Sequence, residues 1–174
     1  MKCKSLGLAV LLAAFAASAL AQTQISGTRK CGKADPAQTQ TIEVGDQPGH
    51  VLVIEKGTCP MGVPFEMAGL KSTTFAAAES VDVTAAKFQT RGYGVITMDN
   101  GDKAYVRFQG SGTMKNGTPD TGEGTWSYTG GTGKLKGVKG KGTWKSSNAP
   151  NGEGEDQLQG EYTLPETGAA AGKK

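Results

Sequence analysis

Apolar and polar residues alternate in short runs along most of this chain. Strict alternation over a few positions is typical of a half-buried β-strand. Residues 65–79 are less clear, because Ala76–Ala78 favour helix whereas residues 72–75 favour strand, and we expect a strand there. The other predicted strands are Thr39–Val44, His50–Lys56, Ser80–Ala85, Tyr93–Met98, Ala104–Gln109 and Gln157–Leu164.

Turn signals separate these runs. Residues 99–102 read Asp-Asn-Gly-Asp, a good hairpin turn because Asn-Gly adopts positive φ readily. Residues 115–120 predict another turn, and residues 146–155 a polar loop. Residues 59–64 contain two prolines, which remove donors from a ladder, so we expect no regular structure there. Between residues 122 and 144 the frequent glycines are expected to form turns and bulges.

Strand signals about ten residues apart predict an all-β fold, a single antiparallel up-and-down (calycin-like) β-barrel of about eight strands. We place this domain at residues 22–164 and expect residues 165–174 to form a disordered tail. Closure into a barrel would also remove exposed sheet edges.

The N-terminus has the pattern of a signal peptide. Lys2 and Lys4 precede an apolar run over residues 6–20, and small residues at Ala19 and Ala21 suit cleavage after Ala21. The run is shorter than the roughly 20 residues of a membrane span. We therefore expect a periplasmic or secreted protein without integral membrane association once residues 1–21 are removed.

Two cysteines, Cys31 and Cys59, lie beyond that segment. Cysteines of exported proteins usually pair, and these two lack the close spacing of a redox motif. A structural disulfide is the expected pairing. Closing a loop of this length contributes about 3–4 kcal/mol in the chain-entropy treatment.

Composition and charge exclude some partners. The formal net charge of +3 falls to about +1 when Lys2 and Lys4 leave, so no overall field attracts nucleic acid. A local run of lysines lies between residues 134 and 145, near Trp126, Tyr128 and Trp144. It could contact a glycan or the cell envelope, or simply be a solvated strand face, which is the reading we favour.

Catalytic residue types are sparse. His50 is the sole histidine, so neither a histidine metal site nor a Ser-His-Asp arrangement is expected, and carboxylate pairs lie on predicted turns. Residues 129–134 resemble a phosphate loop but lack its spacing. We expect no metal and no cofactor. Whether the protein is an enzyme stays open, and a non-catalytic role is favoured.

If the barrel has a ligand pocket, four side chains are our candidates for its lining: Tyr93, Tyr105, Arg107 and Trp126. Arg107 could bind a carboxylate if its strand parity points inward, although the outward orientation is favoured.

Residues 124–144 also resemble the allene oxide cyclase-like and dirigent-like barrels. The shared mark is a strand, then Gly-Gly-Thr-Gly, an apolar residue, further glycines and another strand. Here it falls at Gly130, Gly131, Thr132, Gly133, Leu135, Gly137, Gly140 and Gly142. The resemblance implies a barrel of that type, as in bacterial secreted members of this group. No catalytic position can be carried over, so a cyclase activity would rest on fold analogy alone.

The function expected from the sequence is binding of a small apolar or amphipathic ligand inside the barrel. Two alternatives remain, an allene oxide cyclase-like isomerase or cyclase, and an envelope or glycan interaction protein. A filled lumen would disfavour the first two functions, and an open apolar cavity would disfavour the third. The oligomeric state is not predicted.

Overall fold

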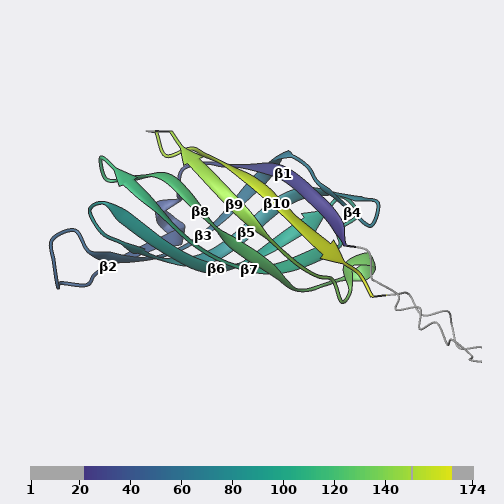
Figure 1. The fold of residues 1–174 in the computed structure, drawn as a ribbon. Coiled ribbons are helices and arrows are strands. Elements are labelled where there is room, and N and C mark those ends of the chain that lie inside the picture. The colour runs from purple at the N-terminus through teal and green to yellow at the C-terminus, as the bar shows by residue number, and fades with distance from the viewer. Residues whose placement is uncertain (1–21, 150, 166–174) are drawn as a thin grey trace, which may run out of the picture.

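The computed structural model describes residues 22–149 and 151–165, and within these ranges it is built almost wholly of β-strands (Figure 1). Two short 3₁₀ turns, η1 (Pro36–Gln38) and η2 (Gly133–Leu135), interrupt them. The strands are β1 (Thr23–Cys31), β2 (Thr39–Glu43), β3 (Val51–Val63), β4 (Glu66–Met67), β5 (Leu70–Val83), β6 (Lys87–Met98), β7 (Lys103–Lys115), β8 (Thr118–Gly131), β9 (Lys139–Asn148) and β10 (Gly154–Thr163).

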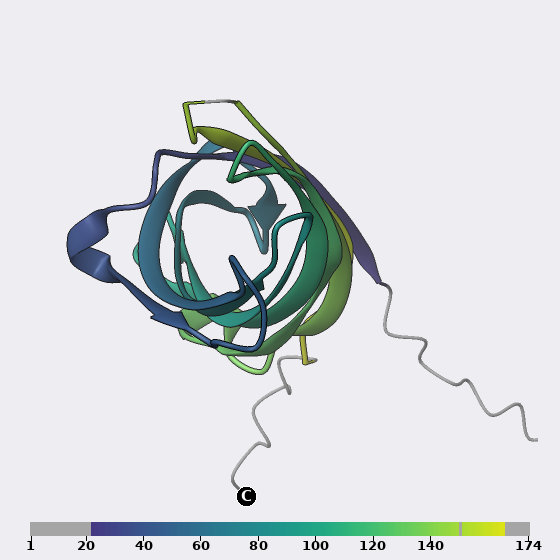
Figure 2. The same ribbon diagram turned by 90° about the vertical axis from the view of Figure 1, so that its left-hand side faces the viewer.

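Eight of these strands form a closed antiparallel barrel, which confirms the predicted fold class. Around the ring the order is β1, β10, β9, β8, β7, β6, β5 and β3, and β3 then pairs back with β1. Figure 2 shows the ring from one end, with η1 and β2 outside it. The short strands β2 and β4 are additions at the edges of β3 and β5.

The seam between β1 and β3 is the least paired junction of the ring. Only Thr28 with Val63 and Arg29 with Met61 are in register there, whereas β1 pairs with β10 along its whole length. The Cys31–Cys59 disulfide joins the two strands, two residues after Arg29 in β1 and two residues before Met61 in β3. The disulfide therefore secures the seam that closes the barrel, as well as the loop between the cysteines.

Several strands are longer than the sequence indicated. Residues 59–63, expected to be irregular, complete β3. Pro60 is tolerated because it is the last residue that pairs with β5, while pairing with β1 begins at Met61. The predicted loop over residues 146–155 is also too long, since β9 continues to Asn148 and β10 begins at Gly154. Residues 70–83 form one strand, not two.

The predicted hairpin turns are confirmed. Gly101 has φ of 88° in the turn between β6 and β7, and Asn116 and Gly117 have φ of 52° and 78° in the turn between β7 and β8. Left-handed backbone at both central positions is the requirement of a primed hairpin turn, and Asn116 and Gly117 meet it. At Asn100–Gly101 only the glycine has positive φ, so this hairpin turn is not of the primed type.

The lumen is filled mainly by aromatic rings that lie against glycines. Trp126 lies over Gly142 and Gly160, Trp144 over Gly110 and Gly124, and Phe75 over Gly94; a Cβ built at any of these glycines would overlap the ring. Most strand glycines of β6 to β10 are thus required because a ring approaches the backbone closely. The sequence-based expectation that glycines chiefly form turns is wrong for these positions.

One end of the barrel is closed by apolar side chains. Met67 from β4 and Leu135 from η2 are both fully buried there, and Figure 1 shows these elements at the same end of the barrel. The Tyr128 hydroxyl donates to Met67 Sδ at 3.2 Å, and the Ala68 amide donates to the Tyr162 hydroxyl at 3.0 Å. The buried core therefore begins at this plug and continues along the lumen.

Residues 1–21 and 166–174 lie outside the described residues, and with them the predicted signal peptide and nearly all of the predicted tail. Among the described residues no helix is long and apolar enough to cross a membrane.

Substitution of a ring-covered glycine should destabilise the protein. Gly142→Ala forces a methyl group into the Trp126 ring and the Gln159 carbonyl, and we expect it to lower the free energy of unfolding by about 1–3 kcal/mol. Gly57→Ala is the matched control, because a Cβ at Gly57 meets no atom within 4 Å. Urea unfolding of both variants measures the difference; equal stability of the two would contradict the packing described.

Removal of the disulfide should loosen the seam. The Cys31→Ser, Cys59→Ser double variant is expected to lose about 3 kcal/mol of stability. Its amide hydrogens in β1 and the C-terminal half of β3 should exchange faster than those in β7 and β8. Uniform exchange throughout the barrel would argue against a local role for the bond.

Candidate functional site

The four sequence-predicted site residues do not lie together in the lumen. Trp126 faces inward and is 9% exposed, whereas Tyr93 and Tyr105 are on the outer face and are 70% and 37% exposed. Arg107 is exposed too, and its Nε donates to the Ser127 hydroxyl at 3.1 Å. Three of the four side chains therefore point away from the barrel interior, and for Arg107 this is the orientation that we favoured. In β7 the inward parity belongs to Val106 and Phe108.

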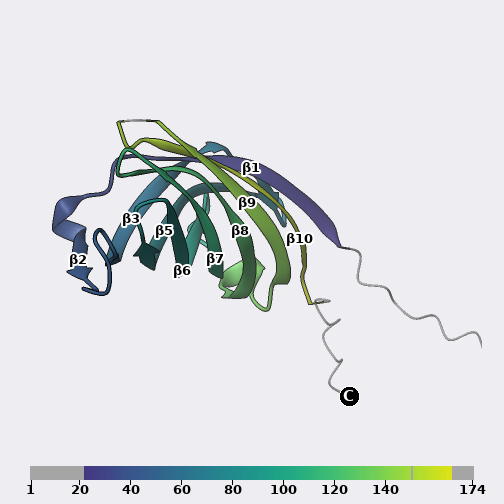
Figure 3. The ribbon, with the colours of Figure 1, turned by 60° about the vertical axis from the view of Figure 1, so that its left-hand side comes forward.

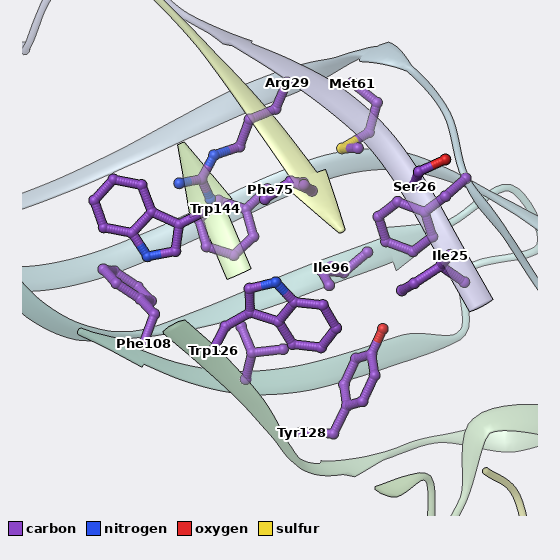
Figure 4. Close-up of a pocket in the computed structure, with 13 residues that line it drawn as sticks. Ile25, Ser26, Arg29, Met61, Phe75, Ile96, Phe108, Trp126, Tyr128 and Trp144 are labelled. Atoms are coloured by element: carbon purple, nitrogen blue, oxygen red, sulfur yellow. The ribbon is translucent and has the colours of Figure 1, made fainter. Parts of the chain in front are cut away.

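A small cavity of about 30 Å³ lies inside the barrel, beside the β1–β3 seam. A space of this size holds about one or two water molecules. Most of its wall is apolar, and the exceptions are Ser26 and Arg29 of β1 and the polar edges of the aromatic rings (Figure 4). The lining residues are Ile25, Ser26, Arg29, Met61, Phe65, Phe75, Ile96, Val106, Phe108, Trp126, Tyr128, Trp144 and Leu158.

Among the hydrogen-bond donors of this wall, the Trp144 indole and the Arg29 guanidinium bear most directly on ligand binding. The Trp144 Nε1 is buried and has no hydrogen-bond partner among the described residues. In contrast, the Trp126 Nε1 donates to the Thr143 carbonyl at 3.1 Å. A buried N–H without an acceptor is unfavourable by about 1–3 kcal/mol. Because Trp144 Nε1 lies against Gly124, an acceptor that displaces the surrounding groups would be stabilised there.

Arg29 is the second donor. Its guanidinium carbon lies 4.1 Å from the centre of the Phe75 ring, and its Nε pairs with the Asp156 carboxylate. Figure 4 shows this side chain reaching from β1 into the pocket. Because the pair is largely buried, it combines a cation–π contact with a charge-assisted hydrogen bond at fixed geometry.

Carboxyl groups gather beyond Arg29, on the side away from the apolar plug. Glu55 and Glu79 are directly opposite each other on β3 and β5, and the Thr90 hydroxyl donates to Glu79. Burial raises the pKa of Glu79, and the nearby Asp156 charge raises it further, while Thr90 and Arg29 act in the opposite direction. Burial also raises the pKa of Glu55, as does the Glu79 charge.

The sequence reading missed Arg29, Asp156 and Trp144 as lumen residues. The position of Arg29 could have been found from the sequence, because alternation in β1 puts Ile25, Gly27 and Arg29 on the same face of the strand. A charged residue on the apolar parity of a strand indicates a buried ion pair, although its partner Asp156 is known only from the register of β1 with β10.

His50 lies apart from the cavity. Its Nδ1 is 2.6 Å from Asp46 Oδ1 and its Nε2 is 2.9 Å from Asp82 Oδ1, and these two carboxylates, Asp46 foremost, raise the pKa of the imidazole. Within the described ranges no group of three or more His, Cys, Asp or Glu side chains is arranged to hold a metal ion.

In its fold, the closed eight-stranded barrel resembles dirigent proteins of known structure. The pterocarpan synthase dirigent protein GePTS1 superposes with a TM-score of 0.50 at 12% identity, over 83% of this chain and 86% of that protein. For the pterocarpan synthase dirigent protein PsPTS1 the TM-score is 0.49 at 12% identity, over 82% and 95% of the two chains. At such identity the likeness concerns the fold.

At the level of sequence, no protein-family model and no curated protein matches the chain.

The buried carboxyl group of Glu79 makes the free energy of unfolding depend on pH. Since the pKa of Glu79 is raised above its ordinary value of 4.5, the folded state holds this proton more tightly than the unfolded state does. The resulting stabilisation is complete below pH 4.5 and is lost as the pH rises through the raised pKa. Glu79→Gln should therefore flatten the fall in unfolding free energy over that range.

Glu123→Gln, on the exposed outer face of β8, is the matched control and should keep the wild-type pH dependence. Chemical denaturation at intervals between pH 4 and 8 measures all three proteins. An unchanged slope in Glu79→Gln would show that other groups cause the dependence.

Proposed function

We propose that this protein is an exported, non-catalytic binding protein whose lumen takes a small ligand with an apolar body and one hydrogen-bond-accepting group. The observation that carries the proposal is that Trp144 Nε1, in a mostly apolar cavity wall, has no hydrogen-bond partner in the described part of the chain. An acceptor oxygen on the ligand would satisfy this donor, and the rings around it would cover the apolar body.

The size of the cavity limits how the ligand enters. Pockets that enclose drug-sized ligands measure roughly 300–1,000 Å³, so the present space of about 30 Å³ takes only part of such a molecule. Ser26 and Met61 line the cavity from the two sides of the sparsely paired seam. A larger ligand would enter through this seam. It would displace Met61 and separate β1 from β3 at the Thr28–Val63 and Arg29–Met61 pairs, while the Cys31–Cys59 disulfide keeps the two strands joined.

Export is supported by the disulfide and by the N-terminal pattern. A disulfide persists in oxidising compartments such as the periplasm and the extracellular space. The basic, apolar and small-residue order of residues 1–21 is the sequence argument for cleavage after Ala21.

A cyclase of the allene oxide cyclase type is the less supported alternative. The filled lumen leaves little room for a reacting substrate, as it does for a bound ligand until the β1–β3 seam opens. In addition, no residue of the chain matches a catalytic position of that family. The buried Glu79 could donate a proton, but it lies beyond Arg29 and does not line the cavity.

The role of Trp144 can be tested with two probes of similar size. Cyclohexanone has a carbonyl acceptor and methylenecyclohexane does not. We expect cyclohexanone to shift the indole N–H resonance of Trp144 in ¹⁵N-labelled protein. Trp144→Phe keeps an aromatic ring but lacks the donor, and it should weaken cyclohexanone binding by about two- to tenfold, the effect of one hydrogen bond.

Methylenecyclohexane should bind equally well to the wild type and to Trp144→Phe. Thermal melting should show that Trp144→Phe is folded. Native mass spectrometry of the exported protein provides a second measurement, in which a co-purified small molecule is expected. Absence of a co-purified molecule, together with an indole resonance that cyclohexanone leaves in place, would refute the proposal.

A further inference from the structure

A second, larger hollow lies on the outer wall of the barrel. It is a groove of about 770 Å³ across strands β7, β8, β9, β10 and β1, which run side by side (Figures 1 and 3). Its lining residues are Gln24, Arg107, Phe108, Gln109, Thr125, Trp126, Ser127, Lys141, Gly142, Thr143, Gln159, Gly160 and Glu161. Phe108 and Trp126 also line the cavity in the lumen, so the groove lies on the other side of the same barrel wall.

The groove has a low floor and two high walls. On β8 and β9 the outward side chains are largely short hydroxyl groups, Thr125, Ser127 and Thr143. On β7 the longer Arg107 and Gln109 form one wall. The opposite wall consists of Gln159 and Glu161 of β10 with Gln24 of β1, whose Nε2 donates to Glu161 Oε2 at 3.3 Å.

Neutral hydrogen-bonding groups predominate in this groove. Three hydroxyls and three carboxamides line it, beside only three charged side chains. Hydroxyl and amide groups both donate and accept, so they match a ligand that carries many hydroxyl groups of its own. All of them extend from paired strands, which hold a binding surface more rigidly than loops do.

Two cations flank the floor within one cross-strand row. Arg107 pairs with Ser127, and Ser127 pairs with Lys141. Strands are about 4.8 Å apart, so the Cα atoms of Arg107 and Lys141 are separated by roughly 10 Å. A carboxylate placed over Ser127 would lie between a guanidinium and an ammonium group, both on long flexible side chains.

An exposed aromatic ring continues this row. Tyr93 is directly opposite Arg107 on β6 and is 70% exposed. Tyr105 is on the same outer face, on the strand of Arg107 itself, and is 37% exposed. Exposed tyrosines beside a polar groove offer an apolar face with a hydroxyl edge, which suits the C–H face of a pyranose ring.

We propose that this outer groove binds a carboxylated glycan, an oligosaccharide of uronic acid type, with a carboxylate between Arg107 and Lys141. A nucleic acid fits less well, because its dense phosphates need several cations along the groove, whereas Glu161 lines it and Glu123 is on the same face. Trp126 and Trp144 are 9% and 6% exposed and their rings face the lumen, so they offer no stacking surface to a ligand in the groove.

Calorimetric titration of the mature protein with tetragalacturonate tests the proposal. We expect measurable binding that weakens at higher salt, because an ion pair contributes to it. The Arg107→Gln, Lys141→Gln double variant should bind at least tenfold more weakly. Lys145→Gln is the matched control, on the same strand and the same exposed face but outside the groove, and it should stay within twofold of the wild type.

Two more measurements separate the alternatives. Cellotetraose, which has no carboxylate, should bind more weakly than tetragalacturonate and should be insensitive to the double variant. Thr125→Tyr fills the floor and should block both sugars without altering the melting temperature. No binding of tetragalacturonate, equal losses in Lys145→Gln, or tighter binding of an oligothymidylate of similar charge would overturn the proposal.

Discussion

The packing of large aromatic rings directly on glycine backbone is the interaction on which this barrel depends. The indole of Trp126 or Trp144 fits inside a narrow barrel of eight strands only if the adjacent strands that it covers have no Cβ beneath it. Each ring then covers backbone from two strands and shields their hydrogen bonds from water. The same packing leaves a cavity of only about 30 Å³, so the aromatic rings are both the core of the protein and the wall of its pocket.

The number of backbone pairs between neighbouring strands differs around the barrel. Most neighbouring strands share long ladders, but β1 and β3 share two register pairs and a disulfide. The edge of β3 that does not pair with β5 has two partners in turn: its first residues pair with β2 and its last residues pair with β1. The region of lowest pairing adjoins the cavity, which places the most deformable part of the wall beside the proposed binding site.

Alternation lets one set of strands form two unrelated surfaces. On β8, for example, Trp126 and Tyr128 face the lumen while Thr125 and Ser127 face the outer groove. The inward rings keep the wall rigid, and the outward polar groups are therefore held at fixed spacing. The lysines between residues 134 and 145 are all exposed, and of these only Lys141 lines the groove.

Much of the architecture follows from local sequence. The alternating runs and the Asn-Gly turns determined an all-β meander, because period-two burial and primed turns are properties of neighbouring residues. The pairing of Cys31 with Cys59 followed from their number and context. The glycines of β6 to β10 could not be interpreted locally, because their cause is a ring on another strand. Likewise the parity of Tyr93, Tyr105 and Arg107 relative to the lumen, the Arg29–Asp156 pair and the isolated Trp144 N–H were decided by tertiary structure, since each depends on which strands meet when the barrel closes.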